Sequence, residues 1–180
     1  MSGRDETGYG QVARALHWTA AVALIATFLL ALGMDAAPRG ALRDGLKVAH
    51  YTAGVLALGF GLARLGWRLF ARGPALEGGV LQVLAAKGAH VALIALGIAV
   101  PLSGLAVRWA RGRSVELLGG ISLPPPFAIP GGRAWGEVHE AMAWGFVLVV
   151  GLHVAAVAWH ALVLRDGTLR RMWGAPRRVA

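Results

Sequence analysis

Cysteine is absent from all 180 residues of the chain. Its absence excludes disulfide bonds, thiolate metal sites and iron–sulfur clusters. It also excludes the covalent attachment of haem through a C-x-x-C-H motif. The chain does contain six histidines.

Charge is also scarce, because only 15% of the residues are charged whereas 57% are hydrophobic. The mean hydropathy of +0.60 is typical of a membrane protein. A net charge of +9 would suit nucleic acid, but the basic residues flank apolar stretches in ones and twos. We therefore expect lipid headgroups to be their partners, and no nucleic acid.

Long apolar runs are the main feature of the sequence. Crossing a hydrocarbon core of about 30 Å takes roughly 20 helical residues, and four segments are long enough. They lie near residues 14–34, 46–70, 82–109 and 136–164. The first is too long for a cleavable signal peptide and has Arg14 and His17 at its start. The sequence predicts an all-α fold, a four-helix transmembrane bundle that forms one integral-membrane unit over residues 1–180.

The basic residues also predict the orientation. Four spans place both termini on one side, which has eleven basic residues, namely Arg4, Arg14, Arg64, Arg68, Arg72, Lys87, Arg165, Arg170, Arg171, Arg177 and Arg178. The opposite side has seven, namely Arg39, Arg43, Lys47, Arg108, Arg111, Arg113 and Arg133. By the positive-inside rule we expect a multi-pass protein of the bacterial inner membrane with cytoplasmic termini.

Two features interrupt the helical pattern. Pro101 lies inside the third span and predicts a kink there. The longest link follows Arg108 and is rich in glycine and proline, so it ends that helix. We expect this link to cap the external face.

All six histidines lie within the predicted spans. The last span has three of them, and its His139 and His153 are 14 residues apart, which is about 21 Å of rise and about 40° short of four turns. They therefore point the same way at two depths. Helix direction predicts that His50 pairs with His139 near the external face. His17 then pairs near the cytoplasm with His153 or, on depth alone, with His160.

Haem fits between such pairs, because two imidazoles can fill both axial positions of its iron and its apolar ring suits a bundle core. Gly54, one turn after His50, leaves room for a porphyrin face. His90, Gly97 and Gly104 recur every seven residues and give the third span a face with little bulk. A lone histidine or a glycine stripe is often only a packing feature. A zinc site fits less well, because it would gather about four ligands at one depth.

Several motifs together resemble the bacterial cytochrome b561 family over nearly the whole chain. They are RALHW, KVAHYTAGVL followed by ARLGWRL, GAHVALIALGIAVPLSG, the loop sequence GGISLPPP, and WGEVHEAMAWGFVLVVGLH. The resemblance implies a four-helix bundle of the inner membrane that holds two haems b.

The resemblance also implies which residues hold the haems. It gives His17 and His153 as the ligands of the cytoplasmic haem, and His50 and His139 as those of the external haem. His160 becomes a partner of a ligand or propionate, and His90 a contact of the quinone or of a propionate. Arg64 and Arg68 suit the cytoplasmic haem propionates, or else extend to lipid headgroups.

The function implied is electron transfer between a periplasmic donor and the quinone pool. Some family members look like superoxide oxidases that reduce ubiquinone, and the basic external face would attract such an anion. An alternative is a cytochrome b subunit that passes electrons from a hydrogenase- or dehydrogenase-like partner to quinone. A channel or proton carrier with a histidine relay would leave the two matched layers unexplained. The oligomeric state, a homo-oligomer included, stays open.

Overall fold

A computed structural model describes residues 8–71 and 79–173 of the chain. Four long helices dominate it and agree with the four predicted spans. They are α1 (Gln11–Ala36), α2 (Ala41–Phe70), α3 (Val80–Trp109) and α4 (Ala134–Trp159). The first three are longer than expected, whereas α4 begins two residues earlier and gives way to a π-helical turn at His160. All four are long and apolar enough to cross a membrane, with α4 continuing to Leu164 for this purpose.

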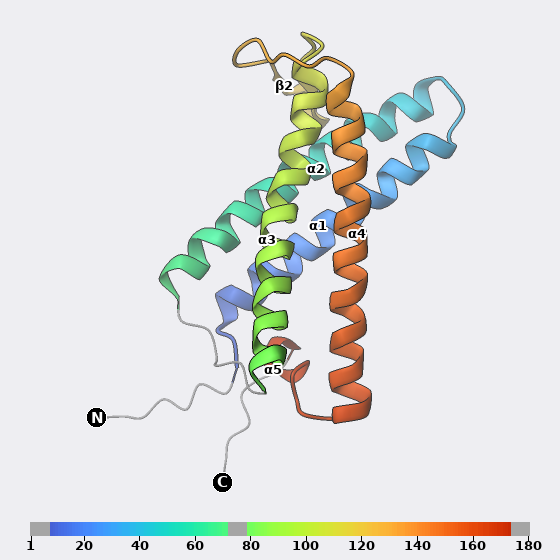
Figure 1. Ribbon diagram of the computed structural model, residues 1–180. Coiled ribbons are helices and arrows are strands. Elements are labelled where there is room, and N and C mark those ends of the chain that lie inside the picture. Colours follow the sequence, from blue (N-terminus) through green and yellow to red (C-terminus); the bar gives the residue numbers. More distant parts are fainter. Residues whose placement is uncertain (1–7, 72–78, 174–180) are drawn as a thin grey trace.

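The helices are arranged as two antiparallel pairs. The α1–α2 pair is tilted against the α3–α4 pair (Figure 1), and the closest packing between the pairs is that of α2 on α3. Gly61 permits this approach, since a β-carbon there would lie 3.4 Å from Ile98 and 3.6 Å from the Gly97 carbonyl oxygen. The two pairs therefore meet most closely along α2 and α3.

Few side chains are buried in the described residues, because much of the apolar surface points outward. Val22, Leu148 and Leu152 are each more than 60% exposed. In water such a surface would be costly, whereas in a bilayer it faces hydrocarbon. The packed positions are small residues, including Ala20, Ala57 and Ala106.

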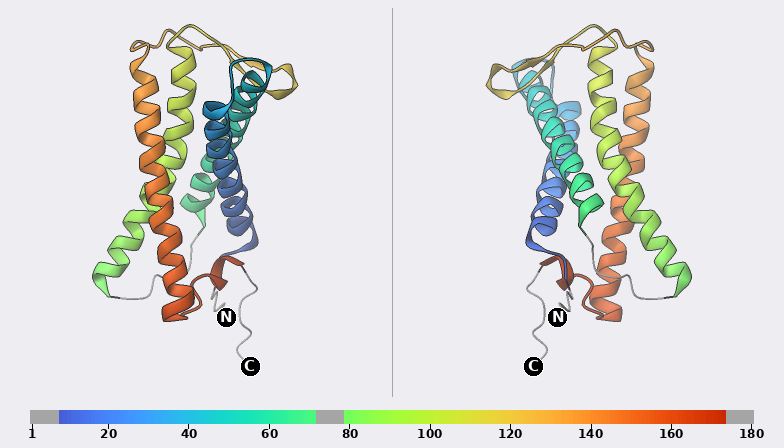
Figure 2. Two further views of the ribbon diagram at one scale, coloured as in Figure 1. Left: turned by 90° about the vertical axis from the view of Figure 1, so that its right-hand side faces the viewer. Right: turned by 90° about the vertical axis from the view of Figure 1, so that its left-hand side faces the viewer.

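Pro101 lies inside α3, as the sequence predicts. Figure 2 shows that α3 is bent, and the half that precedes the bend leans away from α4. A proline lacks the N–H that would bond to the carbonyl one turn earlier, which explains the bend.

The link between α3 and α4 folds over one end of the bundle, as expected, and we call this end the loop end (Figure 2). It contains a short antiparallel ladder of β1 (Val115–Glu116) with β2 (Ser122–Leu123), joined through the 3₁₀ turn η1 (Leu118–Gly120). The Leu118 N–H donates to Thr52 Oγ1 at 2.9 Å, and Val115 is 1% exposed. The loop is thereby fixed to α2.

At the opposite end, where α1 begins and α4 ends, the chain after α4 turns back. We call this the terminal end. A π-helical turn, η2 (His160–Leu164), is followed by Arg165 in the left-handed conformation with φ 51°.

Residues 165–173, including α5 (Arg170–Trp173), then reach the start of α1, and we call them the terminal strap. Trp18 Nε1 donates to the Met172 carbonyl at 3.2 Å, and the Trp18 and Trp173 rings meet edge to face with centroids 4.8 Å apart. The terminal strap therefore joins the end of α4 to the start of α1.

Candidate functional site

Two groups of histidines lie at opposite ends of the bundle. At the loop end, His50 of α2 faces His139 of α4, with ring centroids 6.5 Å apart and ring planes at 83°. The structure thus brings together the pair that helix direction predicts. Because each histidine comes from a different helix pair, this group lies where the two pairs meet.

In each loop-end histidine, ring atom Nδ1 lies close to a backbone carbonyl oxygen that can accept a hydrogen bond from it. His50 Nδ1 lies 2.8 Å from the Thr27 carbonyl oxygen, and His139 Nδ1 lies 3.1 Å from that of Val100. A carbonyl only accepts, so in both rings the proton is on Nδ1. Nε2 is then left with a free lone pair, which is the arrangement that metal-binding histidines require.

A hydroxyl reinforces this arrangement at His139. Ser103, which is 4% exposed, donates from Oγ to the Val100 carbonyl at 2.7 Å. Its oxygen, 2.9 Å from His139 Nδ1, is therefore the acceptor of the imidazole N–H. His139 is held in one tautomer by two acceptors.

Gly104 leaves the space in which the His139 ring lies. A β-carbon at this position would be 3.2 Å from His139 Cε1, closer than ordinary packing permits. Gly104, the last member of the seven-residue stripe, therefore makes room for the His139 ring. Gly54 faces α1 instead, where a β-carbon would meet Thr27 Cγ2 at 3.8 Å, an ordinary contact.

The terminal-end group is larger than the predicted pair. His153 of α4 and His90 of α3 have ring centroids 6.1 Å apart, and both act electrostatically on His17 of α1. Arg64 of α2 donates from Nη1 to His17 Nδ1 at 2.7 Å. All four long helices thus contribute to this group.

Arg64 gives His17 the opposite tautomer. A guanidinium only donates, so His17 Nδ1 is the acceptor and the proton of a neutral ring is on Nε2. Binding a metal through Nε2 therefore requires Arg64 to release this contact. Arg68, one turn further along α2, is exposed.

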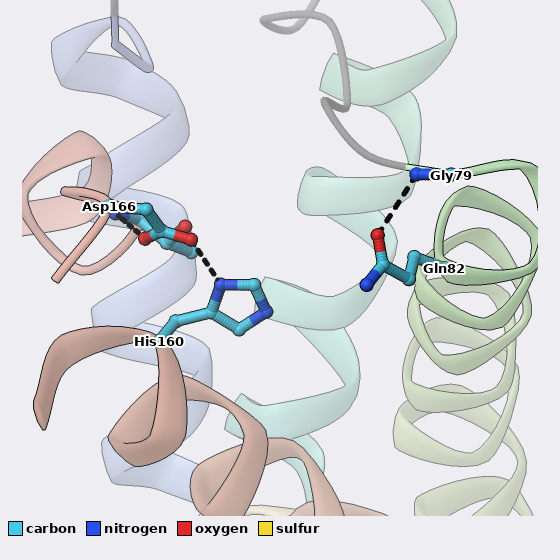
Figure 3. Close-up of polar contacts among 5 residues, drawn as sticks. Gly79, Gln82, His160 and Asp166 are labelled. Atoms are coloured by element: carbon cyan, nitrogen blue, oxygen red, sulfur yellow. Dashed lines mark hydrogen bonds and ion pairs between the residues drawn. The ribbon is translucent and has the colours of Figure 1, made fainter. Parts of the chain in front are cut away.

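His160 points away from this group, towards the terminal strap. Its Nδ1–H donates to the Asp166 carboxylate, and the Thr168 N–H donates to the same carboxylate at 3.0 Å (Figure 3). These contacts lower the pKa of Asp166 well below its usual range, chiefly through the hydrogen bond from His160. Figure 3 also shows the side chain of Gln82 capping the first turn of α3 at Gly79.

The loop end also has a basic surface. An open hollow there is lined by Arg111, Arg113, Gly132 and Arg133. Among the other basic residues at this end, Lys47 pairs with Asp44 at 2.8 Å and Arg108 donates to the Ser114 carbonyl at 2.8 Å. Positive charge therefore gathers between the loop and the start of α4.

Sequence reasoning did not identify Ser103 or Asp166 as part of these groups. Both have a signal in the sequence, because Ser103 is the sole hydroxyl residue of α3 and Asp166 the sole acid after Glu140. A lone polar residue in an apolar helix usually has a specific partner. The acceptors Thr27 and Val100 act through their carbonyls, which carry no sequence signal.

The residues at the loop end fit a b-type haem by their chemistry, since both imidazoles present an unprotonated Nε2. Comparison with known proteins agrees. The family model of prokaryotic cytochrome b561 matches residues 8–175. Cytochrome b561 homolog 2 from Escherichia coli (strain K12) is 29% identical over 174 residues, which cover 92% of this chain and 91% of that protein. The resemblance read from the motifs is thereby confirmed: the chain belongs to the prokaryotic cytochrome b561 family, whose members are haem b-binding electron-transfer cytochromes of the membrane.

Proposed function

We propose that this chain carries electrons through two haems b, from a donor at the loop end to a quinone. His50 and His139 would hold one haem, and His17 and His153 the other. The observation that carries the proposal is that α4 contributes one histidine to each of two separate groups at opposite ends of the bundle. One site would need only one group, whereas a path across the membrane needs both.

A haem held between two such histidines would supply one-electron transfer at each group. The chain's own residues hold the imidazoles in place for this. Thr27, Val100 and Ser103 fix the tautomers at the loop end, and Gly104 leaves room for the His139 ring. At the terminal end, Arg64 and Arg68 would supply positive charge for the haem propionates. The ring of His90 lies beside that of His153 and would help to hold it in position.

We infer that the donor is a small anion such as superoxide and that the loop end faces the periplasm. The hollow formed by Arg111, Arg113 and Arg133 supports this, because a positive surface concentrates an anion near a site. Two superoxide anions would release two electrons and become dioxygen. One ubiquinone would take up both electrons with two protons and become ubiquinol.

The first test is the haem content of the protein purified in mild detergent. Oxidised and dithionite-reduced spectra, with a pyridine haemochrome assay, should give about two haems b per chain. Folded protein from haem-replete cells that contained no haem would overturn the proposal. A content of one haem per chain would contradict an electron path through two haems.

The second test concerns the donor. The isolated protein should reduce ubiquinone when superoxide is generated enzymatically, and superoxide dismutase added to the same mixture should abolish this activity. A hydrogenase- or dehydrogenase-like protein that co-purifies, together with no response to superoxide, would instead identify the chain as a cytochrome subunit.

A further inference from the structure

The loop between α3 and α4 exposes apolar side chains at the turn between β1 and β2. Leu118 is 58% exposed and Ile121 is 57% exposed. Between them, Gly119 and Gly120 have positive φ angles of 82° and 76° and carry no side chain. We call residues 117–121 the loop tip. Its exposed side chains are therefore those of two large aliphatic residues, and it contains no charged residue.

The loop tip lies against α2 within the part of that helix that crosses the membrane. The Leu118 N–H donates to Thr52 Oγ1, which is about two helical turns inside the predicted span 46–70. The α1–α2 pair is tilted (Figure 1), and Figure 2 shows the loop projecting sideways past this pair. The loop tip is therefore level with the boundary between headgroups and hydrocarbon at the loop end.

The backbone of the hairpin suits this depth, because hydrocarbon cannot satisfy free N–H groups. The Leu117 N–H donates to the Ile121 carbonyl at 2.8 Å, in addition to the bond between Leu118 and Thr52. β1 and β2 pair with each other directly beside the loop tip. The three prolines that follow β2 have no N–H to satisfy.

The charged residue of this hairpin, Glu116, lies on its other face. Ser122 follows Ile121 directly, and successive residues of a strand point to opposite faces. Glu116 is opposite Ser122 in the ladder and accepts a hydrogen bond from its hydroxyl at 2.9 Å. The hairpin thus has one polar face, made by Glu116 and Ser122, and one apolar side at the loop tip.

We propose that the loop tip inserts Leu118 and Ile121 into the lipid leaflet at the loop end and thereby anchors the loop over the bundle. The lipid that surrounds α2 is continuous with this position, because Leu56, one turn from Thr52 on the same face, is 54% exposed. The partner of the loop tip is therefore lipid. This inference goes beyond the proposed function and requires neither haem nor electron transfer.

The test uses the absence of cysteine, since a single introduced thiol is then the only one in the protein. The holoprotein is placed in nanodiscs that hold one copy each and treated with a charged, water-soluble maleimide. Leu118→Cys and Ile121→Cys should react on the order of tenfold more slowly than Ser122→Cys, because the reagent stays in water and lipid disfavours the thiolate. Ser122→Cys is the matched control, being the next residue on the polar face.

Two further variants give the limits of the scale. Arg39→Cys, on the turn between α1 and α2, marks the rate in water, and Leu148→Cys, 64% exposed on α4, marks the rate in lipid. Each rate is divided by that of the same variant in denaturing detergent, which removes differences in intrinsic reactivity. Size-exclusion chromatography selects the folded protein.

Adding Leu118→Ser to Ile121→Cys should move its rate towards that of Arg39→Cys, because the loop tip loses half of its apolar anchor. The inference is overturned if Ile121→Cys reacts as fast as Ser122→Cys, a result that would leave the exposed loop tip to a protein partner. It is also overturned if the added Leu118→Ser leaves the slow rate of Ile121→Cys unchanged.

Discussion

At the residue scale, the histidines of this chain are distinguished by their partners. His139 is held by Val100 and Ser103, His17 by Arg64, and His160 by Asp166. Residues of one type therefore have different tasks, according to the partner that each contacts. An imidazole can bind iron only through a ring nitrogen that has no proton and that these contacts leave free.

The first prediction concerns the choice between His153 and His160. We expect His153→Ala to lower the haem content from about two to about one per chain, because an axial ligand is lost. His160→Ala should keep two low-spin haems, since the ring of His160 points to Asp166. Pyridine haemochrome and electron paramagnetic resonance spectra measure both. The opposite pattern would make His160 the ligand.

His90 provides the control for this experiment, because its ring lies beside that of His153 in the same group. His90→Ala should retain both low-spin haems while changing the signal of the terminal-end one. Loss of a haem in this variant would show that His90 and not His17 is the second ligand.

The second prediction concerns Gly104. In Gly104→Ala the new methyl group would lie 3.2 Å from His139 Cε1 and force the ring to move. We expect a loss of stability of about 1–3 kcal/mol, typical of overpacking, and a weakened loop-end haem. Thermal unfolding and haem content measure these effects. Gly88→Ala, where a β-carbon meets nothing within 4 Å, is the matched control; it should keep the haem content and should not lower the stability, since alanine favours a helix over glycine.

At the element scale, the helices fall into two pairs, and the loop and the terminal strap connect them at opposite ends. The loop is bonded to α2 through Thr52, and the terminal strap is bonded to α1 through Trp18. Both connections lie next to a histidine group, since Trp18 follows His17 and Thr52 is two residues from His50. Irregular segments thus help to fix the helices that hold the imidazoles.

The third prediction tests the terminal strap through Asp166. Hydrogen bonding lowers the pKa of this carboxyl in the folded protein, so the ionised form favours folding. That contribution is complete above the unfolded pKa of about 4 and is lost as pH falls below it. We expect the unfolding temperature of the wild type in detergent to fall more steeply between pH 5 and 3 than that of Asp166→Asn.

Asp44→Asn is a suitable control for this measurement, because Asp44 lies at the other end of the bundle and pairs with Lys47 on the surface. Identical pH dependence of the wild type and Asp166→Asn would mean that the terminal strap adds nothing to acid stability.

At the scale of the whole molecule, apolar residues cover the outside and polar groups gather at the two ends. This distribution is the inverse of that in a soluble protein, and it follows from lipid as the solvent. Charge is concentrated at the ends, where substrates would arrive. The basic hollow at the loop end is the clearest example.

The fourth prediction follows from this distribution. Superoxide-driven quinone reduction should slow on the order of tenfold as ionic strength rises, because salt screens long-range attraction of the anion. The double variant Arg111→Gln with Arg113→Gln should be slower at low salt and less sensitive to added salt. Arg39→Gln, on the turn between α1 and α2, is the comparison. A rate that is unaffected by salt would exclude electrostatic steering by the hollow.

Hydropathy and residue spacing are enough to predict the four helices and the two depths of the histidines. A bilayer demands about 20 apolar residues per span, and successive spans alternate in direction, so hydropathy and residue number suffice. The pairing of His50 with His139 follows from these two quantities alone. Pro101 likewise predicted the bend in α3.

The surroundings of each imidazole, in contrast, depend on how the helices pack together. The tilt of one helix pair against the other brings His90 beside His153 and Arg64 onto His17, and tilt and rotation depend on side-chain packing that hydropathy does not record. Thr27 and Val100 accept the histidine N–H groups through their backbone carbonyls, and every residue has a backbone carbonyl. Which carbonyl meets which histidine is fixed by the packing of helix on helix.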